Sequence, residues 1–357
     1  MANNVKKVNG IAIASIAKIN GQNDTDLAKL NGEEFTGSVT YRSHQFTSNG
    51  TFEVTSGGSV DVLVVAGGGG GGQSSSSSPN THPSGGGGGG GVRTGTFTVA
   101  DSTNYTIVVG AGGAEDTDGG LSEVQAINSG SDFEASGGGA GGAGLVNSSH
   151  TAGTTGGHAG GSGGGGGMWG YFSNAAGGTG GSGNAGSYSP VEGYDGGQAT
   201  TSSASQDATG GGGGAGGAAT EQHSGFGEGK GGVGLKNNYI DGEQTSADQE
   251  VYGAGGSGYI DGPARGAGNL SHSGGSRGSG GATNASGRGG LRFDYVDSAS
   301  LRSGGTGLAN LGGGGGGGDG NFTGSAGGAS GASGVVIIRY IDSAVDASGG
   351  TEATYSI

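Results

Sequence analysis

The stretch "VDVLVVAGGGGGGQ", residues 60–73, begins as an apolar strand and passes directly into a run of glycines. Its residues Val62–Val65 are continuously apolar, which is typical of a strand buried on both faces. Glycine accounts for 100 of the 357 residues, whereas hydrophobic residues are 29%. Because the glycine runs have no side chains to bury, the fold depends on what kind of structure glycine itself forms after this strand.

The composition limits the kinds of structure that the glycine runs can form. Glycine-rich chains without a period usually stay disordered, and each ordered Gly costs roughly 0.5–1 kcal/mol more than Ala. Collagen needs Gly at every third position and abundant proline, but this chain has 4 prolines and long uninterrupted glycine runs. The apolar strand argues against disorder and the proline count against collagen, so a third kind of glycine structure is expected.

Charge and residue types exclude several classes of protein. A formal net charge of −15 argues against a nucleic-acid-binding surface. The absence of cysteine excludes disulfides and thiolate metal sites. No stretch approaches the roughly 18 consecutive apolar residues of a membrane span, so the chain is not expected to be embedded in a membrane. The N-terminal "VKKVNGIAIASIAKING" is interrupted by Asn9, Gly10 and Lys18, so we interpret it as mature structure and not as a signal peptide.

Residues 1–36 contain an eleven-residue repeat. An apolar residue followed by Asn-Gly recurs at 8–10, 19–21 and 30–32, and Ile16-Ala17-Lys18 recurs as Leu27-Ala28-Lys29. An eleven-residue period can indicate a right-handed helical supercoil, but Asn-Gly is a turn signal, so arches or hairpins broken by one helical turn fit better. So small a segment is not expected to fold alone. We predict that it attaches to a partner or to its own copies through Val8, Ile16, Ile19, Leu27 and Leu30, the alternative being a flexible leader.

From residue 38 the apolar pattern has a period of two. The stretch 38–67 predicts three strands, with an Asn49-Gly50 turn of the kind favoured in hairpins and a second turn at Gly57-Gly58. The stretch 91–113 predicts two more strands, and "GVVIIRYID" at 334–342 a last one. The simplest topology places this last strand beside the third strand in a small β-sandwich. The sandwich strands are then 38–110 and 334–342, and the remainder, 111–333, is an insertion within one glycine-rich domain spanning 37–357.

A structureless insertion of this length would be anomalous, and small side chains do recur in it every third residue. Three is the period of polyproline II, which rises about 3.1 Å per residue and has no internal hydrogen bonds. Parallel glycine helices of this type can bond to their neighbours, at a net gain of about 1 kcal/mol per bond. We therefore predict a mainly β fold in which the sandwich frames a polyglycine II bundle with short loops. The repeating residues are Ala140 and Ala143; Thr179, Ser182 and Ala185; Ala215 and Ala218; Ser276 and Ser279; and Ala326, Ala329 and Ala332.

Aromatic residues are concentrated in the inserts between the glycine runs. Aromatic side chains on scaffold-held loops are typical of recognition surfaces. The other interpretation is that they cap the bundle or pack between its helices. The inserts lie at 168–172, 187–195, 236–252, 258–266 and 291–303, and their candidate binding residues are Trp169, Tyr171, Phe172, Tyr188, Tyr194, Tyr239, Tyr259, Phe293 and Tyr295.

The sequence gives no support to an enzyme, a cofactor or a metal site. The 6 histidines are scattered without metal-ligand spacing, and no catalytic triad or paired carboxylates can be placed. The stretches "GAEDTDGG" at 113–120 and "GGGDGNFTG" at 316–324 fit no calcium-loop pattern, so we interpret their acidic residues as solvated turns. Matches to GxGxxG carry no meaning inside glycine runs.

"FEVTSGGSVDVLVVAGGGGGG", "YTIVVGAGGA" and "GVVIIRY" resemble the glycine-rich domain that recurs in bacteriophage structural proteins. The legs with variable aromatic loops are similar to the tail-fibre tip adhesins of T-even-like phages, over about residues 38 to 342. The N-terminal repeat resembles leaders of marine-phage virion proteins. The sandwich frame and the leader differ from the attachment domain of the T-even adhesins.

The resemblance implies a non-enzymatic appendage on the outside of the virion, such as a tail fibre or fibre tip. Its leader would bind other virion proteins, its loops would bind a host receptor that is a protein or a glycan, and a homotrimer is the assembly expected of a fibre. One alternative is a decoration or connector protein without a receptor role. Others, from different classes, are an ice-binding protein and a secreted adhesin.

Overall fold

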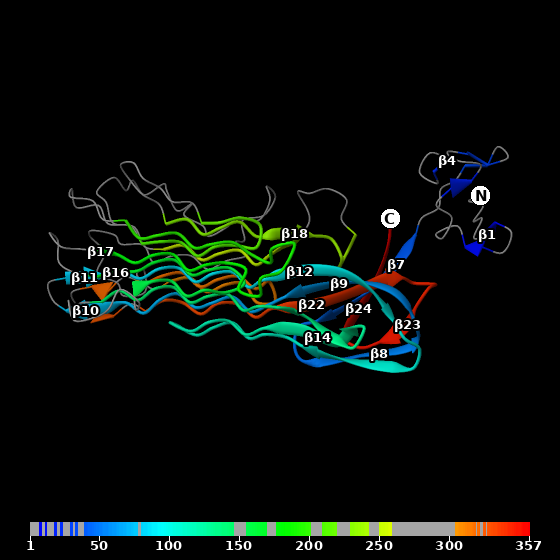
Figure 1. Ribbon diagram of the computed structural model, residues 1–357, viewed down its shortest axis with the longest axis horizontal. Coiled ribbons are helices and arrows are strands. Elements are labelled where there is room, and N and C mark those ends of the chain that lie inside the picture. Colours follow the sequence, from blue (N-terminus) through cyan, green and yellow to red (C-terminus); the bar gives the residue numbers. More distant parts are fainter. Residues whose placement is uncertain are drawn as a thin grey trace.

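The computed structural model describes two sheets at one end of an elongated molecule and a bundle of glycine-rich segments extending from them (Figure 1). Among the described residues the fold is all β. The described residues are 39–77, 80–145, 155–169, 176–200, 209–219, 229–242, 250–258, 304–318, 320–321, 324–325 and 327–357, together with six two-residue strands before residue 35.

Each of the two main sheets has five antiparallel strands. The first sheet has the order β12-β9-β22-β7-β24 and the second the order β15-β14-β13-β8-β23. The strands of the first sheet are β12 (Val92–Val99), β9 (Gly58–Val65), β22 (Val335–Ile341), β7 (Thr40–Phe46) and β24 (Thr351–Ser356). Those of the second are β15 (Ser131–Ala135), β14 (Ser122–Asn128), β13 (Thr103–Val108), β8 (Gly50–Ser56) and β23 (Asp346–Ser348).

The last apolar strand lies beside the third, as the sequence predicts. Strand β22 pairs with β9 in a register that sets Val335 opposite Val65 and Ile338 opposite Val62. The central strands β9 and β22 are buried on both faces at Val62–Val65 and Val335–Ile338, which explains their continuous apolar runs. Alternate residues such as Val62 and Val64 pack between the two sheets, and Leu63 and Ile337 pack on the other face against Tyr252 and Leu311.

The prediction of a hairpin at Asn49-Gly50 is wrong, because the two flanking strands, β7 and β8, belong to different sheets. Strand β7 pairs with β22 and β24, whereas β8 pairs with β13 and β23. The Asn49 side-chain carbonyl accepts a hydrogen bond from the Val109 N–H at 2.9 Å, which ties the crossover to the end of β13. The chain likewise changes sheets between β8 and β9, at Gly57.

Four strands of the frame lie outside the ranges that the sequence assigned to it. Strands β14 and β15 fall within 111–333, and β23 and β24 follow residue 342. A register shift between Val124 and Asn128, with Ala126 at a φ of 57°, interrupts the alternation of β14. Strand β24 lies at a sheet edge and is mostly exposed, so it lacks an apolar pattern. Its place is set by pairing to β7 and not by side-chain burial.

The N-terminal repeat forms three short antiparallel pairs. These are β1 (Lys7–Val8) with β2 (Ile11–Ala12), β3 (Lys18–Ile19) with β4 (Gln22–Asn23), and β5 (Lys29–Leu30) with β6 (Glu33–Glu34). The pairs recur at the eleven-residue spacing, and each encloses one Asn-Gly. Val8, Ile19 and Leu30 occupy the same position in each pair, while Ile16 and Leu27 lie outside the described residues.

Six strands continue into the glycine bundle at one end of the sandwich, where these strands begin or finish. We call the bundle segments legs. Strands β9, β13 and β15 run outward into legs, whereas β12, β14 and β22 receive the chain from them. The legs are residues 66–73, 84–91, 110–116, 117–121, 136–144, 155–160, 162–167, 177–186, 192–199, 209–215, 229–234, 253–258, 304–308, 312–318 and 327–334.

The N–H groups of each inner leg donate to three neighbouring legs in rotation. In leg 66–73, counting from Ala66, the first, fourth and seventh N–H groups donate to leg 84–91. The second and fifth donate to leg 117–121, and the third and sixth to leg 327–334. These distances are 2.8–3.0 Å, so the bonds have ordinary peptide geometry. The legs thus repeat every third residue and bond in three directions, whereas a strand bonds in two.

The carbonyl groups of the same leg accept from three further legs, so leg 66–73 has six hydrogen-bonded neighbours. The acceptor side is occupied by legs 110–116, 136–144 and 312–318. Leg 84–91 also has six neighbours. It donates to legs 136–144, 209–215 and 312–318 and accepts from legs 66–73, 162–167 and 253–258.

Side chains replace missing neighbours at the edges of the bundle. The Asp118 carboxylate accepts the Ala140 N–H at 2.7 Å, and Asp195 accepts the Gly183 N–H at 2.7 Å. Glu115 likewise accepts the N–H of Gly328 at 3.0 Å. These bonds satisfy backbone donors where no further leg is present, which gives part of the acidic composition a structural role.

At most of their glycines, the inner legs approach so closely that no Cβ atom fits. A Cβ on Gly67, Gly69 or Gly88 would lie less than 3.0 Å from a neighbouring backbone carbonyl. Gly197 differs, because a Cβ there would meet only the Ala219 Cβ at 3.4 Å and backbone atoms of Gly211 at 3.5 Å. Glycine is therefore required by the spacing of the inner legs and not at every outer position.

We predict opposite effects for two Gly-to-Ala substitutions. G88A should lower the free energy of unfolding by about 1–3 kcal/mol or more, because the methyl group collides with leg 162–167. G197A should be neutral or stabilise by roughly 0.4–1 kcal/mol, because it only restricts the unfolded chain. Denaturant unfolding of both variants measures this difference. Equal destabilisation by the two would contradict close backbone packing as the reason for glycine.

Candidate functional site

The end of the bundle far from the sandwich carries three short hairpins. They are β10 (Ser75–Ser77) with β11 (Asn80–His82), β16 (Met168–Trp169) with β17 (Ala176–Gly177), and β20 (Gly320–Asn321) with β21 (Gly324–Ser325). They lie together at the left of Figure 1, opposite the sandwich. The first hairpin contacts the third. We call this region the far end.

Side-chain hydroxyls tie the far end together where the glycine runs stop. The Ser84 N–H donates to the Gly318 carbonyl at 3.1 Å, and the Gly318 N–H donates back to the Ser84 Oγ at 2.8 Å. The Thr209 hydroxyl donates to the Ser84 carbonyl at 2.8 Å. These residues are buried, so they form a fixed base beneath the hairpins. Other buried polar residues here are Ser74, His82 and Ser257.

The base also holds the strand that carries Trp169. The Met168 N–H donates to the Pro83 carbonyl at 3.2 Å, and its carbonyl accepts the Leu145 N–H at 3.0 Å. The Met168 side chain is 3% exposed. Burial lowers the pKa of His82, whose Nε2 has no hydrogen-bond partner in the described part of the chain. Met168 thus anchors β16, the strand in which Trp169 is the next residue.

The candidate aromatics do not form one group in the described structure. Trp169 lies on β16 at the far end, whereas Tyr188 and Tyr239 pack near the sandwich. Tyr194 lies on leg 192–199 and is 40% exposed. Tyr171, Phe172, Tyr259, Phe293 and Tyr295 lie outside the described residues.

Tyr188 is held against the sandwich by charged partners. The Arg93 guanidinium lies 3.6 Å from the centroid of its ring, and the hydroxyl donates to Glu134 at 2.8 Å. Burial, followed by this hydrogen bond, raises the pKa of the Tyr188 hydroxyl to about 12. Arg93 also lies 4.5 Å from the Phe133 ring centroid, so it links Tyr188 to β15. For Tyr188, these contacts favour the second interpretation of the insert aromatics, in which they pack within the structure and do not bind a partner.

A buried carboxylate fixes the same loop. Glu192 has no exposed surface, and its two oxygens accept the Ser136 N–H at 2.7 Å and the Gly186 N–H at 3.1 Å. Its carbonyl accepts the Val92 N–H at 2.9 Å, which joins the loop to the start of β12. Glu192 therefore has a structural role that its place in a charged insert did not indicate.

Tyr239 closes the outer face of the first sheet. The Arg339 guanidinium lies 3.9 Å from its ring centroid, and the Tyr239 carbonyl accepts the Tyr355 hydroxyl at 3.1 Å. Arg339 also donates to Asp61 at 3.2 Å. The ring packs against the cluster formed by Leu63, Val65, Val92, Ala215, Tyr252, Val335 and Ile337. The insert that contains Tyr239 thus covers apolar surface, with β18 (Leu235–Asn237) paired to β19 (Glu250–Tyr252).

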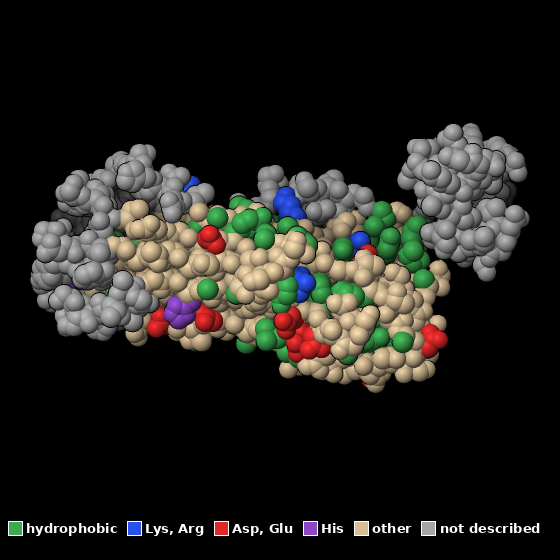
Figure 2. All heavy atoms as spheres, in the orientation of Figure 1, with side chains coloured by type: hydrophobic (Ala, Val, Ile, Leu, Met, Phe, Trp, Pro, Cys, Tyr) green, Lys and Arg blue, Asp and Glu red, His purple; other side chains and the backbone are tan. Residues whose placement is uncertain are grey.

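On the face of the molecule drawn in Figure 2, charged side chains on the legs are few. Figure 2 shows one face on which backbone and small polar residues dominate the legs, while acidic side chains gather beside the sandwich. Among the described residues, no group of three or more His, Asp or Glu side chains is placed to hold a metal ion. Within the same residues, no helix has the length and apolar character needed to cross a membrane.

Comparison with known proteins places this architecture in a family. The model of a family described as a glycine-rich domain matches residues 47–341. The chain belongs to the glycine-rich domain family. The match begins at the crossover into β8 and ends with β22, so it includes the legs and most of the sandwich. Searches of curated proteins and of solved structures found no match.

Within the glycine-rich domain, the aromatic residues that build the frame can be separated from those at its surface. Y239A should lower the free energy of unfolding by about 2 kcal/mol or more, since it removes packing from the outer face of the first sheet. Y194A should change it by less than about 0.5 kcal/mol, because the side chain is exposed. Thermal or denaturant unfolding tests both. A stable Y239A variant would mean that the insert does not hold the sheet.

Proposed function

We propose that this protein is a non-enzymatic appendage of a bacteriophage virion, a tail fibre or fibre tip, that binds a host-cell receptor with loops displayed by its glycine bundle. The polarity of the molecule carries the proposal. Val39 and Ile357 exchange backbone hydrogen bonds of 3.0 and 3.1 Å at the sandwich end, whereas the three hairpins lie at the far end. Such a molecule can be attached through its N-terminal segment and present its other end outward.

We infer further that the legs are polyglycine II helices packed in a hexagonal lattice. The three-residue rotation of hydrogen bonds and the six neighbours of legs 66–73 and 84–91 support this geometry. Such a lattice is stiff, because each inner leg is bonded on every side. Stiffness would hold the displayed loops in fixed positions, which reduces the entropy lost on binding a receptor.

In this proposal the N-terminal repeat binds other virion proteins, and the protein works outside the cell as part of the particle. Trp169 is the described aromatic that lies at the far end, so we assign the receptor contact to it together with Tyr171 and Phe172. The receptor is a surface protein or glycan of the host, and the assembly is a homotrimer. The similarity of the strand-to-glycine junctions to phage structural proteins supports the placement on a virion.

The test is binding of the labelled protein to a panel of bacterial strains. We expect the wild-type protein to bind at least one strain, and the variant W169A/Y171A/F172A to lose binding by about tenfold or more, as expected when aromatic hot-spot residues are removed. V233A is the matched control, because it shortens an exposed apolar side chain on leg 229–234 that is not among the candidate binding residues, and it should bind normally. Equal binding by the triple variant would exclude this hairpin, and no binding by any form would favour a connector or decoration protein.

Ice binding is a second candidate because one outer leg presents small residues in a row. Thr179, Ser182 and Ala185 are exposed at every third position of leg 177–186. Exposed Val191 and Tyr194 on the adjoining residues interrupt a flat surface. Thermal hysteresis at micromolar protein concentration would support ice binding and overturn the virion proposal.

A further inference from the structure

The last residues of the chain form an arm that closes one side of the sandwich. After β22, strand β23 joins the edge of the second sheet by pairing with β8, and β24 joins the edge of the first sheet by pairing with β7. All six residues of β24 are exposed or half-buried. The arm, residues 342–357, therefore supplies an edge strand to both sheets. Val345 and Ala347 pack on the core between the sheets, whereas β24 is held mainly by backbone and polar contacts.

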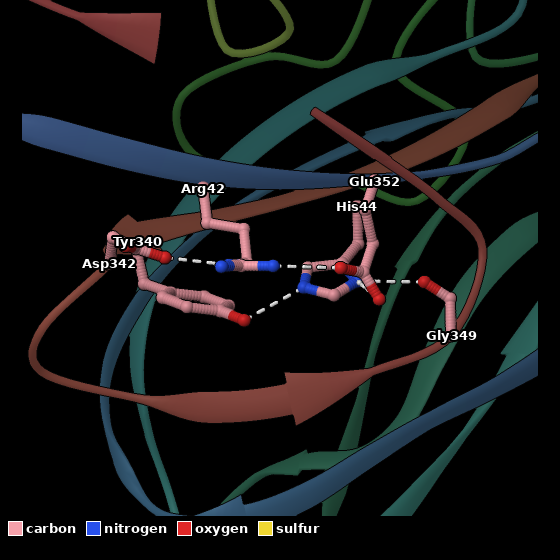
Figure 3. A network of polar contacts seen from close by, with 6 residues as sticks. All are labelled: Arg42, His44, Tyr340, Asp342, Gly349 and Glu352. Atoms are coloured by element: carbon pink, nitrogen blue, oxygen red, sulfur yellow. Dashed lines mark hydrogen bonds and ion pairs between the residues drawn. The ribbon is translucent and has the colours of Figure 1, made fainter. Parts of the chain in front are cut away.

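A buried histidine lies under this arm. His44, in β7, has no exposed surface, and its Nδ1 lies 2.7 Å from the Gly349 carbonyl between the two arm strands (Figure 3). A carbonyl can only accept, so Nδ1 carries the proton. The other nitrogen, Nε2, lies 2.8 Å from the Tyr340 hydroxyl. Burial raises the pKa of that hydroxyl to about 12, so Tyr340 stays protonated and donates to Nε2.

Complete burial of the ring favours a neutral imidazole over an imidazolium. The Tyr340 hydroxyl can turn and accept from a protonated Nε2, so these hydrogen bonds serve either form, and the cost of the charge lies in its loss of hydration. The Phe52 ring, from β8, lies 5.2 Å from the imidazole in an edge contact and offers no polar partner. Burial therefore lowers the pKa of His44.

The charged groups around His44 have opposite effects on its pKa. Glu352, in β24, has a carboxylate oxygen 3.9 Å from Nδ1 and favours the imidazolium. Arg42, in β7, opposes it and is itself paired with Glu352 at 2.9 Å and with Asp342 at 2.6 Å. Asp346, in β23, lies close enough to act on the adjoining Tyr340 hydroxyl. Because Glu352 is already shared with Arg42, it compensates only in part for the burial of His44.

We propose that the arm is an acid-released latch, in which protonation of His44 detaches residues 342–357 from the sandwich. Strand β22 cannot move instead, because Val335–Ile338 are buried in the centre of the first sheet. The arm is the neighbour of His44 with the least buried surface, so its detachment is the least costly way to hydrate the charged ring. Release leaves the outward edge of β7 open to pair with another strand.

The direction of the pH effect follows from proton binding. The closed arm holds His44 neutral, while the open arm lets it titrate near its ordinary pKa of about 6.5. The open form therefore binds more protons, and acid favours it. The latch is fully closed above that pH and weakens as the pH falls through it.

Hydrogen exchange of the full chain at about pH 7.5 and about pH 5 tests the latch, since carboxylates stay largely ionised over this range. We expect protection factors of arm amides, corrected for intrinsic exchange, to fall about tenfold or more at the lower pH, while β9 and β22 keep theirs. H44Q keeps a donor and an acceptor but cannot be charged, so its arm should stay protected. H82Q is the matched control, because it removes the other buried histidine, at the far end, and should behave as wild type.

A second measurement does not depend on the variant folding. The imidazole of His44 in the wild-type protein should titrate, by nuclear magnetic resonance, at a pH below about 6.5, because the closed arm holds it neutral. A His44 titration at or above about pH 6.5, an equal loss of protection in β22, or an equal response in a folded H44Q variant would each overturn the proposal.

Discussion

The whole structure depends on backbone hydrogen bonds between legs that lie, at most of their glycines, too close for a Cβ atom. Legs 66–73 and 84–91 each bond to three neighbours as donor and three as acceptor, and legs this close need glycine at most positions. The high glycine content is therefore a packing requirement. It replaces the apolar core that the rest of the chain cannot supply, because net bond energies of about 1 kcal/mol act at nearly every residue.

The β-sandwich sets the starting positions of these legs. Six strands join the legs at one end of the sandwich. The spacing of strands and sheets there fixes the spacing of the leg residues next to them. The far end is closed by Ser84, Thr209 and Gly318, and the lateral edges by carboxylates such as Asp118. The hydrogen bond from His158 is the main reason that the pKa of Asp118 is lowered, which keeps this edge acceptor ionised. Side chains thus complete the backbone hydrogen bonding both at the far end and at the lateral edges of the bundle.

The sequence predicted the parts that depend on local pattern. The strands with apolar alternation, the pairing of β22 with β9 and the three-residue spacing of small side chains could all be found in it. It did not show β14, whose alternation is interrupted at Ala126, or β24, which has no buried side chain. It also could not show that Arg93 and Arg339 hold Tyr188 and Tyr239, because these partners are distant in the chain and meet only after folding. Aromatic residues in glycine-rich inserts are ambiguous for this reason.

The place of β22 in the first sheet has a consequence for biosynthesis. This strand lies between β9 and β7, yet it is made after all of the legs. While the ribosome is still synthesising the legs, the first sheet lacks its central strand and β9 and β7 have no partner between them. The final sheet can close only when residues 335–341 have left the ribosome. A chain that stops before residue 335 lacks the strand that joins β9 to β7, so its first sheet cannot close.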